Sequence, residues 1–156
     1  MRRIAKGFSL VELLVTVSLV GILAAIAIPN FSSSIQNNKV ETEVSDLQRA
    51  LNYARLEAIN RGVTVRIAPT SGTDWATELQ VTLATAATVL RKVPALSSGA
   101  TLVVANVNAM DFNNLGGLNT PSSAVAMTYT RGSITKTVNV CLTGRITVGV
   151  SSPCGN

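Results

Sequence analysis

The sequence contains no histidine, and its acidic residues are few and scattered. It shows no paired-carboxylate arrangement and no glycine-rich phosphate loop, so the usual signs of an active site are missing. These shortages argue against an enzyme, and they predict no catalytic residue, no metal site and no cofactor. Beyond residue 28 the chain is rich in Thr, Val, Ala, Ser and Asn, with few charged or aromatic residues. This composition suits a β-rich domain outside the cytoplasm.

A long apolar run, residues 8–28, dominates the amino-terminal part of the sequence. As a helix that rises about 1.5 Å per residue it is about 30 Å long, close to the hydrocarbon thickness of a bilayer. Arg2, Arg3 and Lys6 precede the run. By the positive-inside rule they stay in the cytoplasm, and the rest of the chain is exported. The run therefore predicts a membrane-spanning helix.

Two simpler explanations fit this run less well. A secretory signal peptide has an apolar region of about 7–15 residues and a small-residue cleavage site, whereas Pro29-Asn30-Phe31 follows this longer run. A plain single-pass anchor explains the length but gives Glu12 no function. Because a carboxylate inside a bilayer costs a few kcal/mol, Glu12 predicts a partner of positive charge.

The residues around Glu12 resemble a known processing signal. Lys6-Gly7-Phe8-Ser9-Leu10-Val11-Glu12-Leu13 is similar to the class III signal of type IV pilins and type II secretion pseudopilins. That signal is a short basic leader ending in Gly, then Phe, with Glu four positions later. The resemblance implies that a prepilin peptidase cleaves between Gly7 and Phe8 and N-methylates Phe8. Residues 1–7 would be the leader, and residues 8–29 the transmembrane and filament-core half of an amino-terminal helix.

The same resemblance implies roles for Glu12 and Pro29. In this family the carboxylate meets the N-terminal amine of a neighbouring subunit, here that of Phe8, as helices pack in the filament. A buried charge left alone is unfavourable, so the pairing would favour correct register between subunits more than raw stability. Pro29 is similar to the helix-kinking proline of pilins, because it removes a backbone donor.

An amphipathic half of the same helix is predicted over residues 30–62. Apolar residues recur there at spacings of three and four, with charged and amide side chains between them. The predicted buried stripe is Val40, Val44, Leu47, Leu51, Ala54 and Ala58. Gly62 suits the left-handed position that follows a helix, so one helix would run from about Phe8 to Arg61.

Alternating apolar and polar residues predict a β-rich extracytoplasmic domain over residues 63–156. The strand candidates are residues 63–67, 79–83, 88–93, 100–104, 124–130, 137–142 and 145–150. Turns are expected at residues 116–117, 119–121, 131–132 and 143–144. The predicted fold class is therefore α+β, the type IV pilin fold, with a long amino-terminal helix packed on an antiparallel β-sheet.

Cys141 and Cys154 lie 13 positions apart in the segment predicted to be exported. An oxidising compartment favours a disulfide between them. Closing a loop of this size adds about 3 kcal/mol of stability in the chain-entropy model. Free thiols or a metal site are the alternative, for which the sequence offers no histidine and no further cysteine.

Further segments resemble the GspH/FimT/FimU group of these proteins. They are the helix end and first strand from Leu47 to Val65, the tryptophan-bearing loop at Asp74-Trp75, and Cys141-x-x-x-Gly144-Arg145 with Cys154. Residues 84–121 match no feature of the group. The resemblance implies a minor type IV pilin that primes pilus assembly and sits at or near the filament tip, supporting twitching, adhesion or DNA uptake. The alternative is a type II secretion pseudopilin of the H type.

The resemblance also implies partners and a location. The partners are other minor and major pilins, met through the amino-terminal helix, together with the prepilin peptidase. Before assembly the protein would lie in the inner membrane as a single-pass protein with its carboxyl-terminal domain in the periplasm. Afterward it would lie in an extracellular pilus.

DNA binding is a further alternative, and Arg145 is its candidate contact. FimT-like minor pilins of some transformable bacteria capture DNA with a Gly-Arg-x-Arg segment, whereas Gly144-Arg145-Ile146-Thr147 lacks the second arginine. Without the leader the chain has ten basic against eight acidic side chains, a net charge of +2, so general attraction to DNA is weak. Binding would need Arg145 to join a patch with other cations, namely Arg66, Arg91, Lys92, Arg131 and Lys136.

Overall fold

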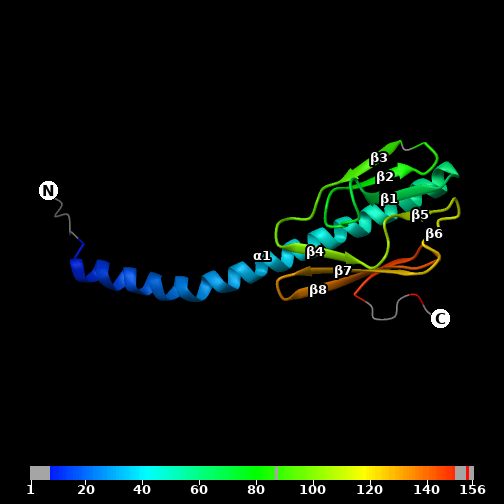
Figure 1. Cartoon of the computed structure of the whole chain (residues 1–156). Coiled ribbons are helices and arrows are strands. Elements are labelled where there is room, and N and C mark those ends of the chain that lie inside the picture. The colour runs from blue at the N-terminus through cyan, green and yellow to red at the C-terminus, as the bar shows by residue number, and fades with distance from the viewer. Residues whose placement is uncertain (1–7, 87, 150–153, 155–156) are drawn as a thin grey trace. The chain divides into compact units, whose positions relative to one another are not determined.

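The computed structural model describes residues 8–86, 88–149 and 154, and of residues 26–30 it describes the backbone alone. The chain forms two compact units, residues 1–38 and residues 39–156. Helix α1 comes first and strands β1 to β9 follow it (Figure 1). The predicted cleavage residue Gly7 lies outside the described residues.

Helix α1 spans Leu10–Arg61, and Ser9 determines where it begins. The Ser9 Oγ accepts a hydrogen bond from the Glu12 N–H at 3.2 Å. The Ser9 carbonyl accepts another from the Leu13 N–H at 3.1 Å. This is N-cap geometry, in which a side chain satisfies an amide that has no partner within the first turn.

Pro29 lies inside α1, which continues without interruption from Leu10 to Arg61. A proline within a helix removes one backbone hydrogen bond, and the flanking turns can still be helical. The kink expected at Pro29 stays a prediction, and the Pro29 side chain lies outside the described residues. In the part of the chain that the structure describes, no helix combines the length and the apolarity needed to cross a membrane.

The second part of α1 carries the predicted buried stripe and ends where the sequence predicts. Gly62 has a φ of 67°, and its N–H donates to the Ile59 carbonyl at 3.3 Å. Every predicted stripe residue is buried, and Ala50 joins them at 0% exposure. The stripe therefore presents small and branched aliphatic side chains to the sheets.

The first sheet has the strand order β3-β2-β1-β5-β6, with antiparallel neighbours throughout. Its strands are β1 (Val65–Pro69), β2 (Leu79–Leu83), β3 (Val89–Val93), β5 (Met110–Phe112) and β6 (Leu118–Thr120). In β1 the side chains of Val65 and Ile67 are fully buried, whereas Arg66 between them is exposed. This alternation is the period of two that a half-buried strand requires.

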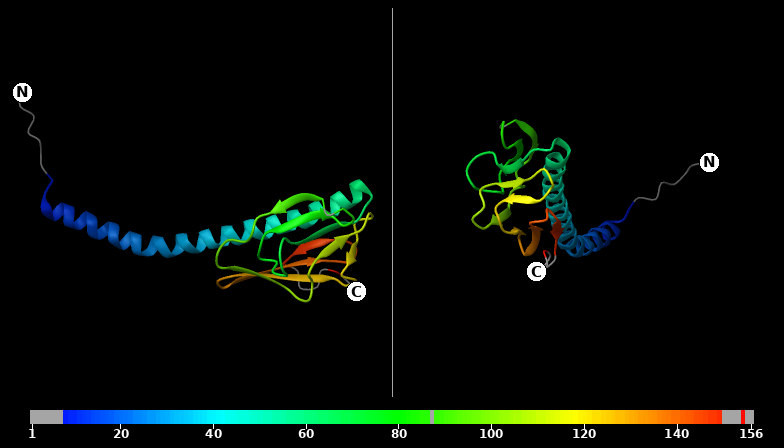
Figure 2. Two further views of the ribbon diagram at one scale, coloured as in Figure 1. Left: turned by 45° about the horizontal axis from the view of Figure 1, so that its top comes forward. Right: turned by 90° about the vertical axis from the view of Figure 1, so that its right-hand side faces the viewer.

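The second sheet has the strand order β4-β7-β8-β9, also antiparallel. Its strands are β4 (Ala100–Val104), β7 (Val125–Arg131), β8 (Ile134–Val140) and β9 (Ile146–Val148). Met127 and Tyr129 of β7 are fully buried. Figure 2 shows both sheets lying along the second part of α1, and the buried residues of α1 and of both sheets form one core.

The predicted α+β fold of a long helix packed on antiparallel strands is confirmed, but the strands form two sheets rather than one. Residues 79–83 and 100–104 are strands at the predicted bounds. The first strand starts two residues later than predicted, because Gly62 to Thr64 turn the chain back from the helix. β8 starts earlier than predicted, because the tight turn at Gly132 already pairs Arg131 with Ile134.

Two short strands were missed. β5 and β6 have three residues each, too few to show an alternating pattern. Asn119 and Thr120, predicted as part of a turn, belong to β6. The predicted strand 145–150 is observed as Ile146–Val148, and Val150 lies outside the described residues.

A hydrogen-bonded network fastens α1 to the second sheet at Glu43. The Tyr129 hydroxyl donates to Glu43 Oε2 at 2.5 Å, and the Ser97 N–H donates to Oε1 at 3.1 Å. The Ser97 hydroxyl also donates to Oε1, and it accepts a bond from Arg131 Nη1 at 2.6 Å. Burial alone raises the pKa of Glu43, but the bonds from Ser97 and Tyr129 and the charge of Arg131 outweigh it, so the pKa lies below the ordinary 4.5.

We expect Glu43→Gln to destabilise the second unit at neutral pH, by about 1–3 kcal/mol, and to weaken its acid sensitivity. Because the pKa of Glu43 is lowered in the folded chain, its ionised form stabilises the fold above pH 4.5. This stabilisation is lost as the pH falls through the folded-state pKa. Urea unfolding of the full-length chain in detergent, followed by Trp75 fluorescence at neutral pH and at about pH 3, measures both effects.

Glu78→Gln is the control for this experiment. Glu78 pairs with Lys92 at 2.9 Å, but both side chains are well exposed, so the pair contributes little. If the free energy of unfolding of the Glu43→Gln chain depended on pH as that of the wild type does, ionised Glu43 would not be the source of the acid sensitivity.

Candidate assembly site and the carboxyl-terminal turn

The first turn of α1 brings Phe8 and Glu12 to the same end of the helix. Ser9 holds the Glu12 backbone through its cap, and a carboxylate in the first turn is favoured by the helix dipole. Phe8 precedes the cap and is 69% exposed. The predicted cleavage after Gly7, methylation of Phe8 and intersubunit pairing of Glu12 stay predictions.

The helix surface beyond Glu12 is apolar. Its large side chains between residues 10 and 23 are 53–76% exposed; they are Leu10, Val11, Leu13, Leu14, Val15, Val17, Leu19, Val20, Ile22 and Leu23. The hydroxyl of Thr16 donates to the Leu13 carbonyl at 2.9 Å, and that of Ser18 to the Leu14 carbonyl at 2.8 Å. These hydroxyls are satisfied by the helix itself and need no polar surroundings.

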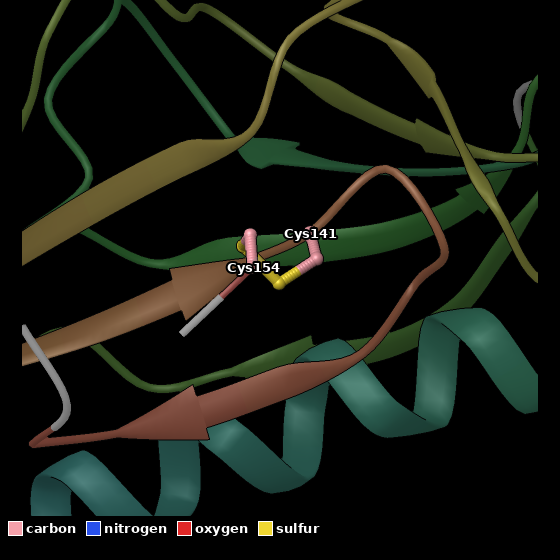
Figure 3. The surroundings of a disulfide bond; sticks show 2 residues. All are labelled: Cys141 and Cys154. Carbon is pink, nitrogen blue, oxygen red and sulfur yellow. A yellow bond between two sulfur atoms is a disulfide. The ribbon is translucent and has the colours of Figure 1, made fainter. Parts of the chain in front are cut away.

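A disulfide joins Cys141 to Cys154, with 5.3 Å between their Cα atoms (Figure 3). Cys141 directly follows β8 and is 2% exposed. The predicted disulfide is therefore confirmed, and the alternative of free thiols is wrong. The bond ties Cys154, near the end of the chain, to an interior strand of the second sheet.

Residues 141–144 form a tight turn between β8 and β9. The Gly144 N–H donates to the Cys141 carbonyl at 2.8 Å, and the Cys141 N–H donates to the Arg145 carbonyl at 2.9 Å. Gly144 has a φ of 77°, which favours glycine. A Cβ atom on Gly144 would lie 1.8 Å from the Gly116 carbonyl oxygen, so a larger residue does not fit.

This turn contacts the turn between β5 and β6, and the two sheets meet there. The Leu118 N–H donates to the Leu142 carbonyl at 2.9 Å. Arg55 of α1 donates through Nε to the Gly116 carbonyl at 3.0 Å. Sequence analysis missed this role of Arg55, because an arginine between stripe residues of an amphipathic helix has the pattern of a surface residue. The glycine pair at residues 116–117, predicted only as a turn, was the one sequence feature that could have indicated a close contact with this turn.

Arg145 is exposed, but the other cations proposed for a DNA-binding patch are engaged elsewhere. The contacts are Arg66 with Asp111, Arg91 over the ring of Tyr53, Lys92 with Glu78, Arg131 with Glu43, and Lys136 with Glu41. Four of these cations form ion pairs with carboxylates, which lowers the net charge that they offer to phosphates. Arg91 stacks on a neutral ring and keeps its charge. The DNA-binding alternative therefore depends on Arg145 and Arg91, and it stays a prediction.

The amino-terminal helix, the antiparallel two-sheet domain and the terminal disulfide define a protein of the pilin class. The family model for Type II transport protein GspH matches residues 43–144, and the Prokaryotic N-terminal methylation motif matches residues 2–28. The chain belongs to the GspH family and is a GspH/FimT/FimU-like type IV pilin. The family match includes residues 84–121, for which sequence analysis found no resemblance.

Solved structures show the same fold. Type IV minor pilin FimU of Pseudomonas aeruginosa PAO1 superposes with a TM-score of 0.66 and 20% identity, covering 74% of this chain and 91% of FimU. A second FimU crystal structure gives a TM-score of 0.61 and 22% identity, covering 71% of this chain and 93% of FimU.

Curated relatives match over shorter stretches. Type IV major fimbrial protein FimA of Dichelobacter nodosus is 44% identical over 60 residues, 36% of this chain and 38% of FimA. A fimbrial protein of Pseudomonas aeruginosa is 46% identical over 55 residues, 33% of this chain and 36% of that protein. The chain thus spans well under half the length of these relatives. Pilins of this family and fold are structural proteins, and so is this chain rather than an enzyme.

We expect Gly144→Ala to destabilise the second unit by about 3 kcal/mol or more, because the added methyl group forces the two turns apart. Gly72→Ala is the matched control: Gly72 has a similar φ of 67°, but a Cβ there meets nothing within 4 Å. The control should lose only about 1 kcal/mol, the cost of the left-handed conformation. Urea unfolding followed by Trp75 fluorescence measures both variants. Equal losses of stability in the two variants would show that the close approach of Gly144 to Gly116 does not exclude a larger side chain.

Proposed function

We propose that this chain is a minor type IV pilin that primes pilus assembly and lies at or near the filament tip with other minor pilins. The observation that carries the proposal is the first part of α1, whose surface is apolar and whose first turn holds the carboxylate of Glu12. This surface suits a membrane before assembly and packed helices of other subunits afterward. The fold shared with the type IV minor pilin FimU supports the same class of function.

Glu12 has a specific task in this proposal. A carboxylate within a packed helical core needs a positive partner, because an unpaired buried charge is strongly unfavourable. The N-terminal amine of Phe8 on a neighbouring subunit supplies that charge once a prepilin peptidase has cleaved after Gly7 and methylated Phe8. The N-terminal methylation motif over residues 2–28 supports this processing.

The proposal includes a location and partners. Residues 8–29 lie in the inner membrane before assembly, and the domain that follows lies in the periplasm. The disulfide between Cys141 and Cys154 supports an oxidising compartment for that domain. After assembly the chain lies in an extracellular pilus, where its amino-terminal helix packs against those of other minor and major pilins.

The match to Type II transport protein GspH favours one alternative, a pseudopilin of the type II secretion system. Both proteins need the same helix packing, so the test must be made in cells. Deleting the gene should abolish or strongly reduce surface pili, because assembly is not primed. Secretion and transformation are assayed in the same strain. Normal pili with lost secretion would support the pseudopilin instead, and normal pili with lost transformation would favour DNA uptake.

We expect Glu12→Ala and Glu12→Gln to reduce incorporation into sheared filaments at least about tenfold, because neither variant offers a negative charge to the Phe8 amine. Cleavage after Gly7 should continue, which the mass of the membrane-bound chain reports. Glu41→Ala is the control. The exposed Glu41 carboxylate pairs with Lys136 within the second unit, so its loss should leave incorporation into filaments unchanged. Recovery of the Glu12 variants at the wild-type level would count against the pairing.

A further inference from the structure

An exposed apolar patch covers the junction of the two turns at the carboxyl-terminal end of α1. It consists of Leu56, Ile59, Leu115 and Leu142, which are 55%, 41%, 83% and 49% exposed, and is called the leucine patch below. Figures 1 and 2 show the turn between β5 and β6 beside this end of α1. The helix packing proposed above gives this surface no role.

The segments that form the leucine patch touch one another. A Cβ atom on Gly116 would lie 2.6 Å from Ile59 Cδ1, so the turn next to Leu115 rests on α1. The Leu142 carbonyl accepts the bond from Leu118, which joins the other turn to the first sheet. The four exposed residues therefore lie on segments of α1 and of both sheets that touch one another. Isolated exposed leucines need no explanation, but several that gather at one junction point to a binding surface.

Leu115 is fixed in its exposed position by the hydrogen bonds of its own turn. Asn113 Oδ1 accepts bonds from the Leu115 N–H at 3.0 Å and from the Gly117 N–H at 2.9 Å. The Asn113 N–H donates to the Gly117 carbonyl at 2.9 Å, and its carbonyl accepts from the Gly116 N–H at 2.8 Å. A leucine held in solvent on a fixed backbone loses little entropy on binding, as an interface anchor requires.

Two arginines lie at the junction that carries the leucine patch. Arg55 supports the turn at Gly116, and Arg145 follows Gly144 and is exposed. Neither forms a salt bridge within the part of the chain that the structure describes, so the two guanidinium groups leave a local charge of +2. This charge complements a partner that surrounds an apolar side chain with carboxylates. DNA fits less well, because it offers Leu115 no apolar contact and its affinity requires several free cations.

We propose that the leucine patch docks the globular domain of a different pilin-type subunit, through an apolar side chain flanked by carboxylates. Leu115 lies at the centre of this interface, and Arg145 lies at its rim. A second copy of this chain is a poor partner, because a symmetric contact would bring two cationic patches together. The inference rests on the proposed function for the class of partner, and it adds a contact outside the amino-terminal helix.

Photo-cross-linking in cells tests the proposal with the full-length chain. Benzoylphenylalanine replaces Leu115 in one strain and Val103 in another; Val103 is 63% exposed on β4 and lies outside the patch. Illumination should cross-link position 115, and not position 103, to another pilin-type subunit that mass spectrometry identifies. Equal yields at the two positions, a cross-link only to a second copy, or a cross-link only to DNA would overturn the proposal.

A second measurement separates docking from folding. With the photo-reactive residue at position 142, Leu115→Asp should lower the cross-linking yield at least about tenfold, whereas Val103→Asp should not. Urea unfolding of the purified Leu115→Asp chain in detergent, followed by Trp75 fluorescence, shows that the variant has folded when its transition matches that of the wild type. An unchanged yield in this folded variant would overturn the proposal.

The two proposals fail in different ways. Normal pili after gene deletion, with the cross-link retained, would overturn the pilus function and leave the docking surface in place. Lost pili without any cross-link from position 115 would overturn the docking surface alone.

Discussion

The second unit depends on close packing between α1 and two sheets that share a single core. Ala50, Ala54 and Ala58 have no exposed surface, and their small side chains let the strands approach the helix backbone. Each sheet buries one face on this helix. Polar contacts at the two ends of the stripe then fix the sheets: Glu43 bonds to the second sheet, and Arg55 bonds to the turn of the first.

The sequence predicted those parts of the fold that local periodicity encodes. The buried stripe of α1 and the strands at residues 79–83 and 100–104 follow from the spacing of apolar residues in the sequence. The helix end follows from one glycine, Gly62, which takes the left-handed conformation. The division into two sheets was not predictable in this way. It depends on which strands pair across long separations, such as β4 with β7 and β1 with β5, and no local pattern records that choice.

The candidate site shows the same limit. The motif around Glu12 is a short stretch of sequence, so it can be recognised without the fold. The disulfide was predictable because the sequence has two cysteines, Cys141 and Cys154, which can pair only with each other within the chain. The suggested cation patch around Arg145 needed side chains from separate elements to converge, and the structure instead gives each of the other cations its own partner. The contact between Gly144 and Gly116 joins turns from different sheets, so it too becomes visible only in the structure.

Affinity and selectivity have different origins in the proposed assembly. A helix surface of exposed leucine and valine with one carboxylate can pack against any helix of the same kind, so it favours association without selecting a partner. Selection needs features that a wrong partner cannot satisfy. A fixed Leu115 among arginines meets this condition, because a partner without an apolar recess loses the anchor and a cationic partner is repelled. The globular unit can therefore determine which subunit follows, while the helix holds the subunits together.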